Sequence, residues 1–156
     1  MSTPAWLDRG YAELRRGVAE MPGGDHNERI LQYHATTSLK ATEDETPWCS
    51  SFVNWCVEHS GYTGTSSARA RSWLFWGRDI PTPREGCIVV MQRGAGAQPG
   101  PSVLEAPGHV GIFVGYSVEP GRGGLILLGG NQGNRVSLRS YSVGRVLGLR
   151  WPDEEE

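Results

Sequence analysis

Apolar residues in the first half of this chain recur at helical spacing, whereas those in the second half gather in short continuous runs. Between residues 3 and 20, apolar side chains return every three or four positions among charged ones, which predicts a first helix. The stretch Pro22-Gly23-Gly24 is expected to stop this helix. A second helix follows, with Asp25 or Asn27 as its cap.

A central helix is predicted to begin within Thr46-Pro47-Trp48-Cys49. Thr46 suits the N-cap, and Pro47 suits the first helical position because it lacks an amide hydrogen that would be unpaired there. The buried stripe of this helix consists of Phe52, Val53, Cys56 and Val57, and Gly61 ends it.

The pattern becomes that of strands after a further helix at 68–76, whose Trp73 and Trp76 share a face suited to core packing. Apolar runs at 87–91, 110–114, 125–128 and 135–138 predict four strands, residues 145–151 predict a closing one, and Gly-rich turns such as 119–124 separate them. Helices followed by strands indicate an α+β fold, with N-terminal helices packed on an antiparallel β-sheet. We expect one domain over residues 1–156, ending in an acidic tail at 153–156.

Composition argues against two classes of function. The net charge is −2, from 15 basic and 17 acidic side chains, and no basic stripe or module indicates a nucleic-acid partner. The apolar runs are too short to cross a bilayer, so we expect no membrane partner. The first residues lack a charged leader followed by an apolar stretch. We therefore expect synthesis as a soluble cytoplasmic protein without a signal peptide.

The three cysteines are Cys49, Cys56 and Cys87. An odd number without a Cys-x-x-Cys pair argues against a disulfide framework and against zinc or redox chemistry. Cys56 lies two turns along the stripe of the central helix and Cys87 begins a strand, so both are interpreted as structural. The same interpretation applies to the histidines that lack ligand spacing, which are His26, His34 and His59. The spacing of these residues gives no support to a metal site.

The residue types needed for cysteine catalysis occur in order along the chain. Cys49 lies at the amino end of a helix, where unpaired amide hydrogens and the helix dipole favour a thiolate. His109 begins an apolar strand and can act as the base. Gly108 leaves room for a substrate beside the imidazole, and Trp48 can line a substrate groove. The alternative for Cys49 is a small buried apolar residue.

A third residue is needed to accept a hydrogen bond from the second imidazole nitrogen and so to fix the tautomer. Asn131 and Gln132 follow an apolar run, and either can do so with its amide oxygen. Adjacent strand residues point to opposite faces, so only one of the two faces His109. We choose Asn131, which leaves Gln132 as a substrate-binding candidate; the alternative is that Asn131 and Asn134 serve a Gly-rich turn.

These motifs together resemble those of the bacterial and phage CHAP and NlpC-type cysteine peptidases, which are papain-like amidohydrolases that cut peptidoglycan. The resemblance spans residues 13–152 and is carried by Asn27-x-Arg29-Ile30, the segment 45–56, the segment 68–73, Gly108-His-Val-Gly111, the segment 129–134 and the segment 147–152. Within this family, the chain is similar to a small single-domain branch that occurs in bacterial genomes and prophages. It implies a papain-like fold with Cys49 as nucleophile, His109 as base and Asn131 as the orienting residue. Many relatives carry Glu at the third position, and Gly86-Cys87 stands where Gly-Asp is usual.

The function implied by this resemblance is hydrolysis of an amide bond in peptidoglycan through a thioester on Cys49, without a cofactor. Amidase and endopeptidase specificity both fit, as do a phage or prophage lysin and a secreted antibacterial effector. We expect action at the cell wall or in the periplasm after export or lysis, with an unidentified delivery or immunity partner. One alternative is a papain-like protease or amidase with a substrate outside the cell wall. Another is a non-catalytic wall-binding module.

Overall fold

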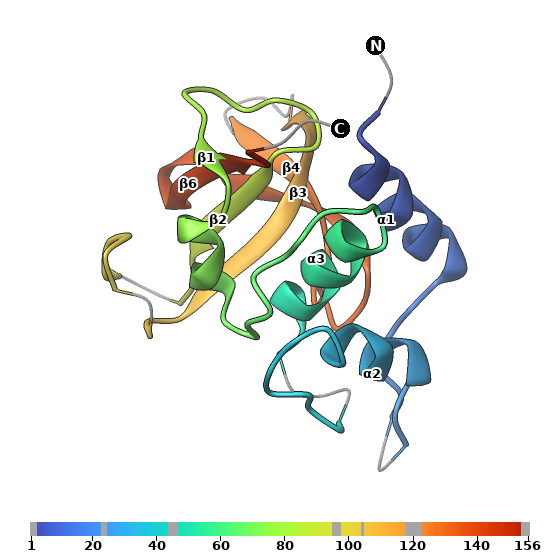
Figure 1. Cartoon of the computed structure of the whole chain (residues 1–156). Coiled ribbons are helices and arrows are strands. Elements are labelled where there is room, and N and C mark those ends of the chain that lie inside the picture. Colours follow the sequence, from blue (N-terminus) through green and yellow to red (C-terminus); the bar gives the residue numbers. More distant parts are fainter. Residues whose placement is uncertain are drawn as a thin grey trace.

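The computed structural model of the chain describes residues 3–22, 25–43, 47–94, 98–103, 105–117 and 123–153. Its α-helices are α1 (Ala5–Arg16), α2 (Glu28–His34) and α3 (Cys49–Glu58), and short 3₁₀ helices occur at η1 (Ala70–Phe75) and η2 (Val143–Arg145). The strands are β1 (Arg78–Asp79), β2 (Ile88–Gln92), β3 (Gly108–Ser117), β4 (Gly124–Gly129), β5 (Ser137–Ser142) and β6 (Val146–Trp151). Figure 1 shows the α-helices gathered beside the sheet.

The strands described here form one six-stranded sheet in the order β1-β6-β2-β3-β4-β5. Every neighbouring pair is antiparallel. Helix α3 packs against β3, and α1 and α2 pack against α3, so the middle of the sheet and the central helix share one core (Figure 1). The predicted α+β fold, with N-terminal helices on an antiparallel sheet, is therefore confirmed.

Helix α3 is buried over nearly its whole circumference rather than along one stripe. All nine residues from Cys49 to Val57 are buried. Its N-cap is Trp48, whose carbonyl accepts the first helical hydrogen bond, from the amide of Phe52 (3.0 Å). Pro47 therefore precedes the helix, and its predicted place as the first helical residue is wrong. Thr46, the predicted cap, lies outside the described residues.

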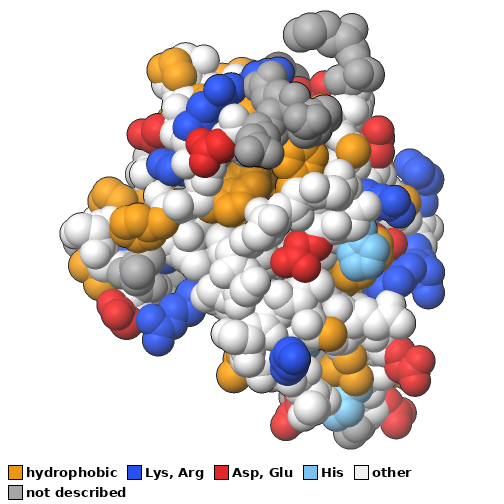
Figure 2. Space-filling view, in the orientation of Figure 1, with side chains coloured by type: hydrophobic (Ala, Val, Ile, Leu, Met, Phe, Trp, Pro, Cys, Tyr) orange, Lys and Arg blue, Asp and Glu red, His pale blue; other side chains and the backbone are white. Residues whose placement is uncertain are grey.

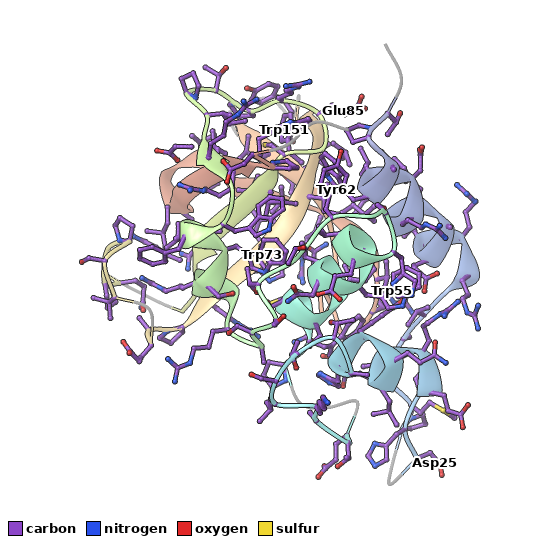
Figure 3. The ribbon with its side chains drawn as sticks, viewed as in Figure 1. Asp25, Trp55, Tyr62, Trp73, Glu85 and Trp151 are labelled. Carbon is purple, nitrogen blue, oxygen red and sulfur yellow. The ribbon has the colours of Figure 1, made fainter. Side chains whose placement is uncertain are left out.

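Hydrogen bonds satisfy the polar side chains that α3 buries. Asn54 accepts from the amide of Thr65 (2.8 Å) and donates to the carbonyl of Ser50 (3.2 Å), while the Ser50 hydroxyl donates to the carbonyl of Ser67 (2.7 Å). The Trp73 indole donates to the same hydroxyl (2.9 Å), and Figure 3 shows this indole between η1 and α3. Because a buried polar group without a partner is costly, these bonds fix the position of the helix that begins with Cys49.

The first helix ends earlier than the sequence predicts. Helix α1 stops at Arg16 because Gly17 adopts a left-handed conformation with φ of 76° and donates to the carbonyl of Leu14. Residues 18–20 then run beside residues 134–136: the amide of Val136 donates to the carbonyl of Val18 (2.9 Å). Pro22 plays no part in ending the helix, and Gly23 and Gly24 lie outside the described residues.

Other elements follow the predicted order with shifted boundaries. Asn27 caps α2 by accepting from the amide of Arg29 (2.8 Å), which selects it over Asp25. The helix predicted at 68–76 is the 3₁₀ helix η1, and the short edge strand β1 was missed. The strand predicted at 135–138 is displaced to β5, because Arg135 forms an isolated bridge with Ala19 instead. Most of the predicted turn at 119–124 lies outside the described residues. The same is true of the acidic tail after residue 153.

Aromatic contacts extend the core from α1 to the last residue of β6. Trp6 of α1 makes edge-to-face contacts with Tyr62 and Trp151, with ring centroids 5.1 and 5.2 Å apart. Figure 3 labels Tyr62 and Trp151. Basic and acidic side chains are interspersed over the face in Figure 2. None of the helices in the described part of the chain has the length and apolar character needed to cross a bilayer.

Candidate active site

The first residue of α3 and the second residue of β3 meet where the central helix packs against the sheet. Cys49 opens the helix, and His109 lies on β3 opposite Met91 of β2. The two side chains are close enough that each shifts the pKa of the other through hydrogen bonding and charge. Both lie just below the surface, with exposed fractions of 4% for Cys49 and 7% for His109. The structure therefore brings together the predicted nucleophile and the predicted base.

The environment of Cys49 favours the thiolate. Burial by itself raises the pKa of this thiol, but the hydrogen bond and charge of His109, the backbone amide of Val110 and the charge of Arg93 together lower the pKa below its ordinary value. The other two cysteines behave in the opposite way. Burial raises the pKa of Cys56 well above its ordinary value and that of Cys87 to about 11. Cys49 is thus chemically distinct among the three free cysteines.

The complementary shift occurs on His109. Burial lowers the pKa of its imidazole, but the hydrogen bond and charge of Cys49 and the hydrogen bond of Gln132 raise it, against an opposing charge from Arg93. The net pKa of His109 is raised. A lowered thiol pKa beside a raised imidazole pKa favours the thiolate and the imidazolium, because each charged form stabilises the other.

Gln132, not Asn131, contacts the imidazole. The Nε2 atom of His109 lies 2.9 Å from Oε1 of Gln132, which is 2% exposed. Asn131 lies in the turn that follows β4, with a left-handed φ of 58°, so the alternation expected along a strand does not apply there. The choice of Asn131 as the orienting residue is therefore corrected to Gln132, and the expectation that Gln132 binds substrate is replaced by this buried contact.

The orientation of the Gln132 amide determines the tautomer of His109. Its Nε2 atom donates to the carbonyls of Leu127 (3.2 Å) and Ser137 (2.8 Å), so Oε1 must be the atom that faces the imidazole. An amide oxygen only accepts, and hence Nε2 of His109 carries a proton. The nitrogen left to exchange a proton with Cys49 is Nδ1, which is the arrangement that a base for this thiol requires.

The turn that carries Gln132 is held close to the start of α3. A Cβ atom on Gly130 would lie 2.6 Å from Cβ of Phe52 and 2.8 Å from the Trp48 ring, so only glycine permits this approach. The backbone amide of Gln132 also donates to the carbonyl of Arg135 (3.0 Å). The distance between His109 and its amide partner is therefore set by backbone packing as well as by the side chain.

Two of the predicted substrate-binding residues have other surroundings. Trp48 has no exposed surface; its ring stacks on Tyr33 and its indole donates to Glu20 (2.9 Å). It therefore does not line a substrate groove, because its ring packs within the aromatic core. Gly108 is half-buried, and a Cβ atom there would lie 3.0 Å from the Arg71 side chain. The room beside this glycine is occupied by arginine rather than by open space.

Arg71 anchors the loop that leads into His109. Its guanidinium is fully buried and donates to four backbone carbonyls of that loop, those of Pro99 (3.0 Å), Gly100 (2.6 Å), Val103 (3.2 Å) and Pro107 (3.0 Å). Hydrogen bonds from a charged donor are stronger than neutral ones. Arg71 thereby fixes the backbone that sets the start of β3.

A pocket of about 200 Å³ opens beside the imidazole. Its lining residues come from the end of β2, the start of β3, the turn after β4, strand β5 and helix η2, and they are Gln92, Arg93, Gly94, His109, Asn131, Arg139, Tyr141 and Arg145. The Tyr141 hydroxyl lies 3.3 Å from Nε2 of His109, and burial raises the pKa of this phenol to about 12. It is therefore a neutral neighbour of the imidazole at physiological pH.

A second hollow, of about 430 Å³, is lined by Gly61, Tyr62, Thr63, Gly64, Trp76, Gly77, Pro152 and Asp153. It contains no nucleophile and neither member of the Cys49–His109 pair, so the smaller pocket is the one linked to chemistry. Among the described residues, no three His, Cys, Asp or Glu side chains gather in a way that could hold a metal ion.

Comparison with protein families agrees with this geometry. The model of the CHAP domain matches residues 41–131, which is more than half of the chain and includes both Cys49 and His109. The chain belongs to the CHAP family. No curated protein and no solved structure matches it. Membership in the CHAP family indicates a hydrolase with amidase or peptidase activity related to peptidoglycan.

Several residues around this CHAP site were missed by reasoning from the sequence. Tyr141 and Arg139 went unnoticed because the fourth strand was placed at 135–138, ahead of β5. Their spacing of two in a strand puts both side chains on one face, and both line the pocket. The alternation of Arg139 and Tyr141 with small serines was the signal that could have found them. Arg71 lies within the segment 68–73 that carries the resemblance, but its anchoring role was not predicted, because a charged residue is rarely fully buried.

Replacing Gln132 by methionine, which has a similar length but no amide, is expected to lower kcat by about 10- to 100-fold. This is the size of a hydrogen bond to a charged group, about 1.5–3 kcal/mol. Because Gln132 raises the pKa of His109, its loss should also move the alkaline limb of the pH–rate profile to lower pH. Steady-state kinetics between pH 5 and 10 measures both effects.

The matched control is Asn131→Gly, which removes the neighbouring amide while accepting the left-handed backbone at that position. It should leave the alkaline limb in place and change kcat much less than Gln132→Met. If the two variants exchanged these effects, the assignment of Gln132 to the imidazole would be wrong.

Proposed function

We propose that this chain is a cysteine-dependent peptidoglycan hydrolase that cleaves an amide bond of the cell wall through a thioester intermediate. The observation that carries the proposal is the buried Cys49–His109 pair, in which the thiol pKa is lowered and the imidazole pKa is raised, within a CHAP chain. Gln132 supports the proposal because its amide oxygen accepts a hydrogen bond from Nε2 of His109, which leaves Nδ1 as the nitrogen available to the thiol. Amidase and endopeptidase specificity both fit this machinery.

The reaction begins when Sγ of Cys49 attacks the carbonyl carbon of the scissile amide. Cys49 is the first helical residue, so its own backbone amide has no acceptor within the helix and can bind the developing oxyanion. The imidazolium of His109 donates its proton to the leaving nitrogen, the C–N bond breaks, and a thioester remains on Cys49.

The second half of the reaction regenerates the enzyme. The neutral imidazole of His109 takes a proton from a water molecule, whose oxygen attacks the thioester carbonyl. The C–S bond then breaks, the carboxylic acid product leaves, and the thiolate and imidazolium are restored. The side chains of Cys49 and His109, the backbone amide of Cys49 and water supply the groups for these steps.

Alkylation of the thiols by iodoacetamide provides a test that needs no substrate. Cys49 is expected to react at pH 6, because its thiolate persists below the pH at which an ordinary thiol is protonated. Cys56 and Cys87 should stay unmodified in the folded protein, because both are buried with raised pKa values. Mass spectrometry of tryptic peptides after a pH series measures the rate at each cysteine.

The unfolded protein serves as the control for this experiment. In denaturant all three cysteines should react alike and slowly at pH 6. Equal rates at the three sites in the folded protein would contradict an activated Cys49 and would favour a non-catalytic module.

The substrate is tested by incubating the protein with purified sacculi and identifying the released fragments by mass spectrometry. A new amino terminus and a new carboxyl terminus within the stem peptide would identify an endopeptidase, and free lactyl groups on the glycan would identify an amidase. No release of fragments by an alkylation-competent protein would contradict peptidoglycan as the substrate. We place its action at the cell wall, reached after export or lysis, as for a phage lysin or a secreted antibacterial effector.

A further inference from the structure

Among the described residues, those that line the pocket beside His109 include three arginines and no acidic side chain. Arg93 follows β2, Arg139 lies on β5 and Arg145 ends η2, so three separate segments each contribute one guanidinium. Within the described part of the chain, none of the three forms an ion pair with a carboxylate. The protein as a whole is slightly acidic, with a net charge of −2. A local excess of positive charge at this pocket is therefore a feature of the site and not of the composition.

The three arginines differ in how firmly they are held. Arg145 is half-buried and donates to the carbonyls of Gln92 (3.2 Å) and Gly94 (2.7 Å), which fixes its guanidinium at the pocket wall. Arg93 and Arg139 are exposed. One arginine thus forms a fixed positive wall, and two can reach toward a ligand that enters from solvent.

Grouped cations without a partner repel one another, and a negative group that binds among them relieves this repulsion. The planar guanidinium matches a carboxylate with two parallel hydrogen bonds, which an uncharged amide cannot reproduce. The pocket is small, about 200 Å³, and His109 is part of its wall. A negative group bound there must lie close to the bond that is cut.

We propose that this arginine pocket, defined by Arg93, Arg139 and Arg145, selects a substrate that carries a free carboxylate next to the scissile amide. The inference rests on the proposed function: peptidoglycan stem peptides bear free carboxylates beside their amide bonds, and these carboxylates can be converted to primary amides. The pocket therefore sets specificity for stem peptides with the free acid. A phosphate of another wall polymer does not fit this role, because it is not attached beside the scissile bond.

Arg139 is the residue on which to test the proposal. The charges that act on Cys49 and His109 are their own and that of Arg93, whereas Arg139 acts on Tyr141. Arg139→Gln therefore removes one guanidinium from the pocket without altering the thiol–imidazole pair. The pH dependence of Cys49 alkylation should be the same in this variant as in the parent, which separates substrate recognition from activation of the nucleophile.

The experiment compares two soluble disaccharide–pentapeptides that are identical except that the stem-peptide carboxylates are free in one and primary amides in the other. For the parent protein, kcat/KM is expected to be about 10- to 100-fold higher on the free acid, as for one charge-assisted hydrogen bond. This ratio of kcat/KM values should fall toward 1 in Arg139→Gln. In Arg139→Lys it should lie between 1 and the parent ratio, because lysine keeps the positive charge but cannot make two parallel hydrogen bonds to a carboxylate. Arg15→Gln, an equal change of charge at an exposed site on α1, should keep the parent ratio.

Binding of the same two probes to the full chain with Cys49→Ala, measured by calorimetry, separates the possible failures. If the parent cleaves neither probe nor sacculi, the proposed function is wrong, and tighter binding of the free acid still supports the arginine pocket. If the parent cleaves both probes with equal kcat/KM, or if both bind equally, the inference is overturned. An unchanged ratio in Arg139→Gln would likewise overturn it.

Discussion

Replacement of Cys49 by alanine is expected to lower turnover on purified sacculi by at least about 10⁴-fold, because the nucleophile and its thioester are lost together. The serine variant should be nearly as inactive. A serine hydroxyl fits the same space but is not ionised by a neighbouring imidazolium, since its pKa is far above that of a thiol. Release of soluble fragments over time measures both variants against the parent.

The fold should survive the Cys49→Ala change. The residue is small and lies at the start of α3, whose position is fixed by the Asn54 and Ser50 hydrogen bonds and not by the sulfur. A thermal midpoint within about 4 °C of the parent would confirm that the lost activity is chemical. Cys56→Ala is the matched control, because Cys56 lies two turns along the same helix and is fully buried. It should cost stability through a small cavity but retain turnover. Digestion of sacculi by Cys49→Ala at the parent rate would remove this residue from the mechanism.

Replacement of His109 by asparagine is expected to abolish turnover to a similar degree. It should also prevent alkylation of Cys49 at low pH. Without the imidazole, the largest remaining influence on Cys49 is burial, which raises the pKa of the thiol. The thiolate is then lost at pH 6 and recovered only at alkaline pH. The rate of turnover should fall by about 10³-fold or more, since proton transfer and the ion pair are lost together.

The measurement for His109→Asn is the iodoacetamide rate at Cys49 across a pH series, followed by turnover at each pH. His59→Asn provides the control, because His59 caps the opposite end of α3 and stacks on Trp55. That variant should keep the alkylation profile of the parent. Rapid alkylation of Cys49 at pH 6 in His109→Asn would show that the helix start alone, and not the imidazole, holds the thiolate.

Much of this molecule was predictable because its chemistry is local. The helix start at Cys49 and the strand start at His109 are visible in short segments, and both residues lie where the pattern places them. The segment around Cys49 was still misjudged in detail: Trp48 rather than a threonine caps the helix, and its ring is buried instead of lining a groove. An aromatic residue beside a nucleophile has no local mark that distinguishes core from groove.

The third residue shows why the remainder was not predictable. Asn131 and Gln132 are both amides, so neither type nor neighbourhood separates them. The outcome depends on a left-handed turn at Asn131 and on carbonyls of Leu127 and Ser137 that bind the Gln132 amide. Which of these two adjacent side chains points toward His109 depends on the backbone conformation of the turn, and the residue types alone do not indicate that conformation.

The sequence by itself determined the order of helices and strands, the α+β class, and the positions of Cys49 at a helix start and of His109 at a strand start. These depend on periodicity and on residue chemistry, which act over a few positions. The tertiary structure alone decided that Gln132 orients the imidazole and that three arginines from separate segments surround one pocket. The physical reason is that both features depend on contacts between residues distant in the chain, whose geometry no local pattern encodes.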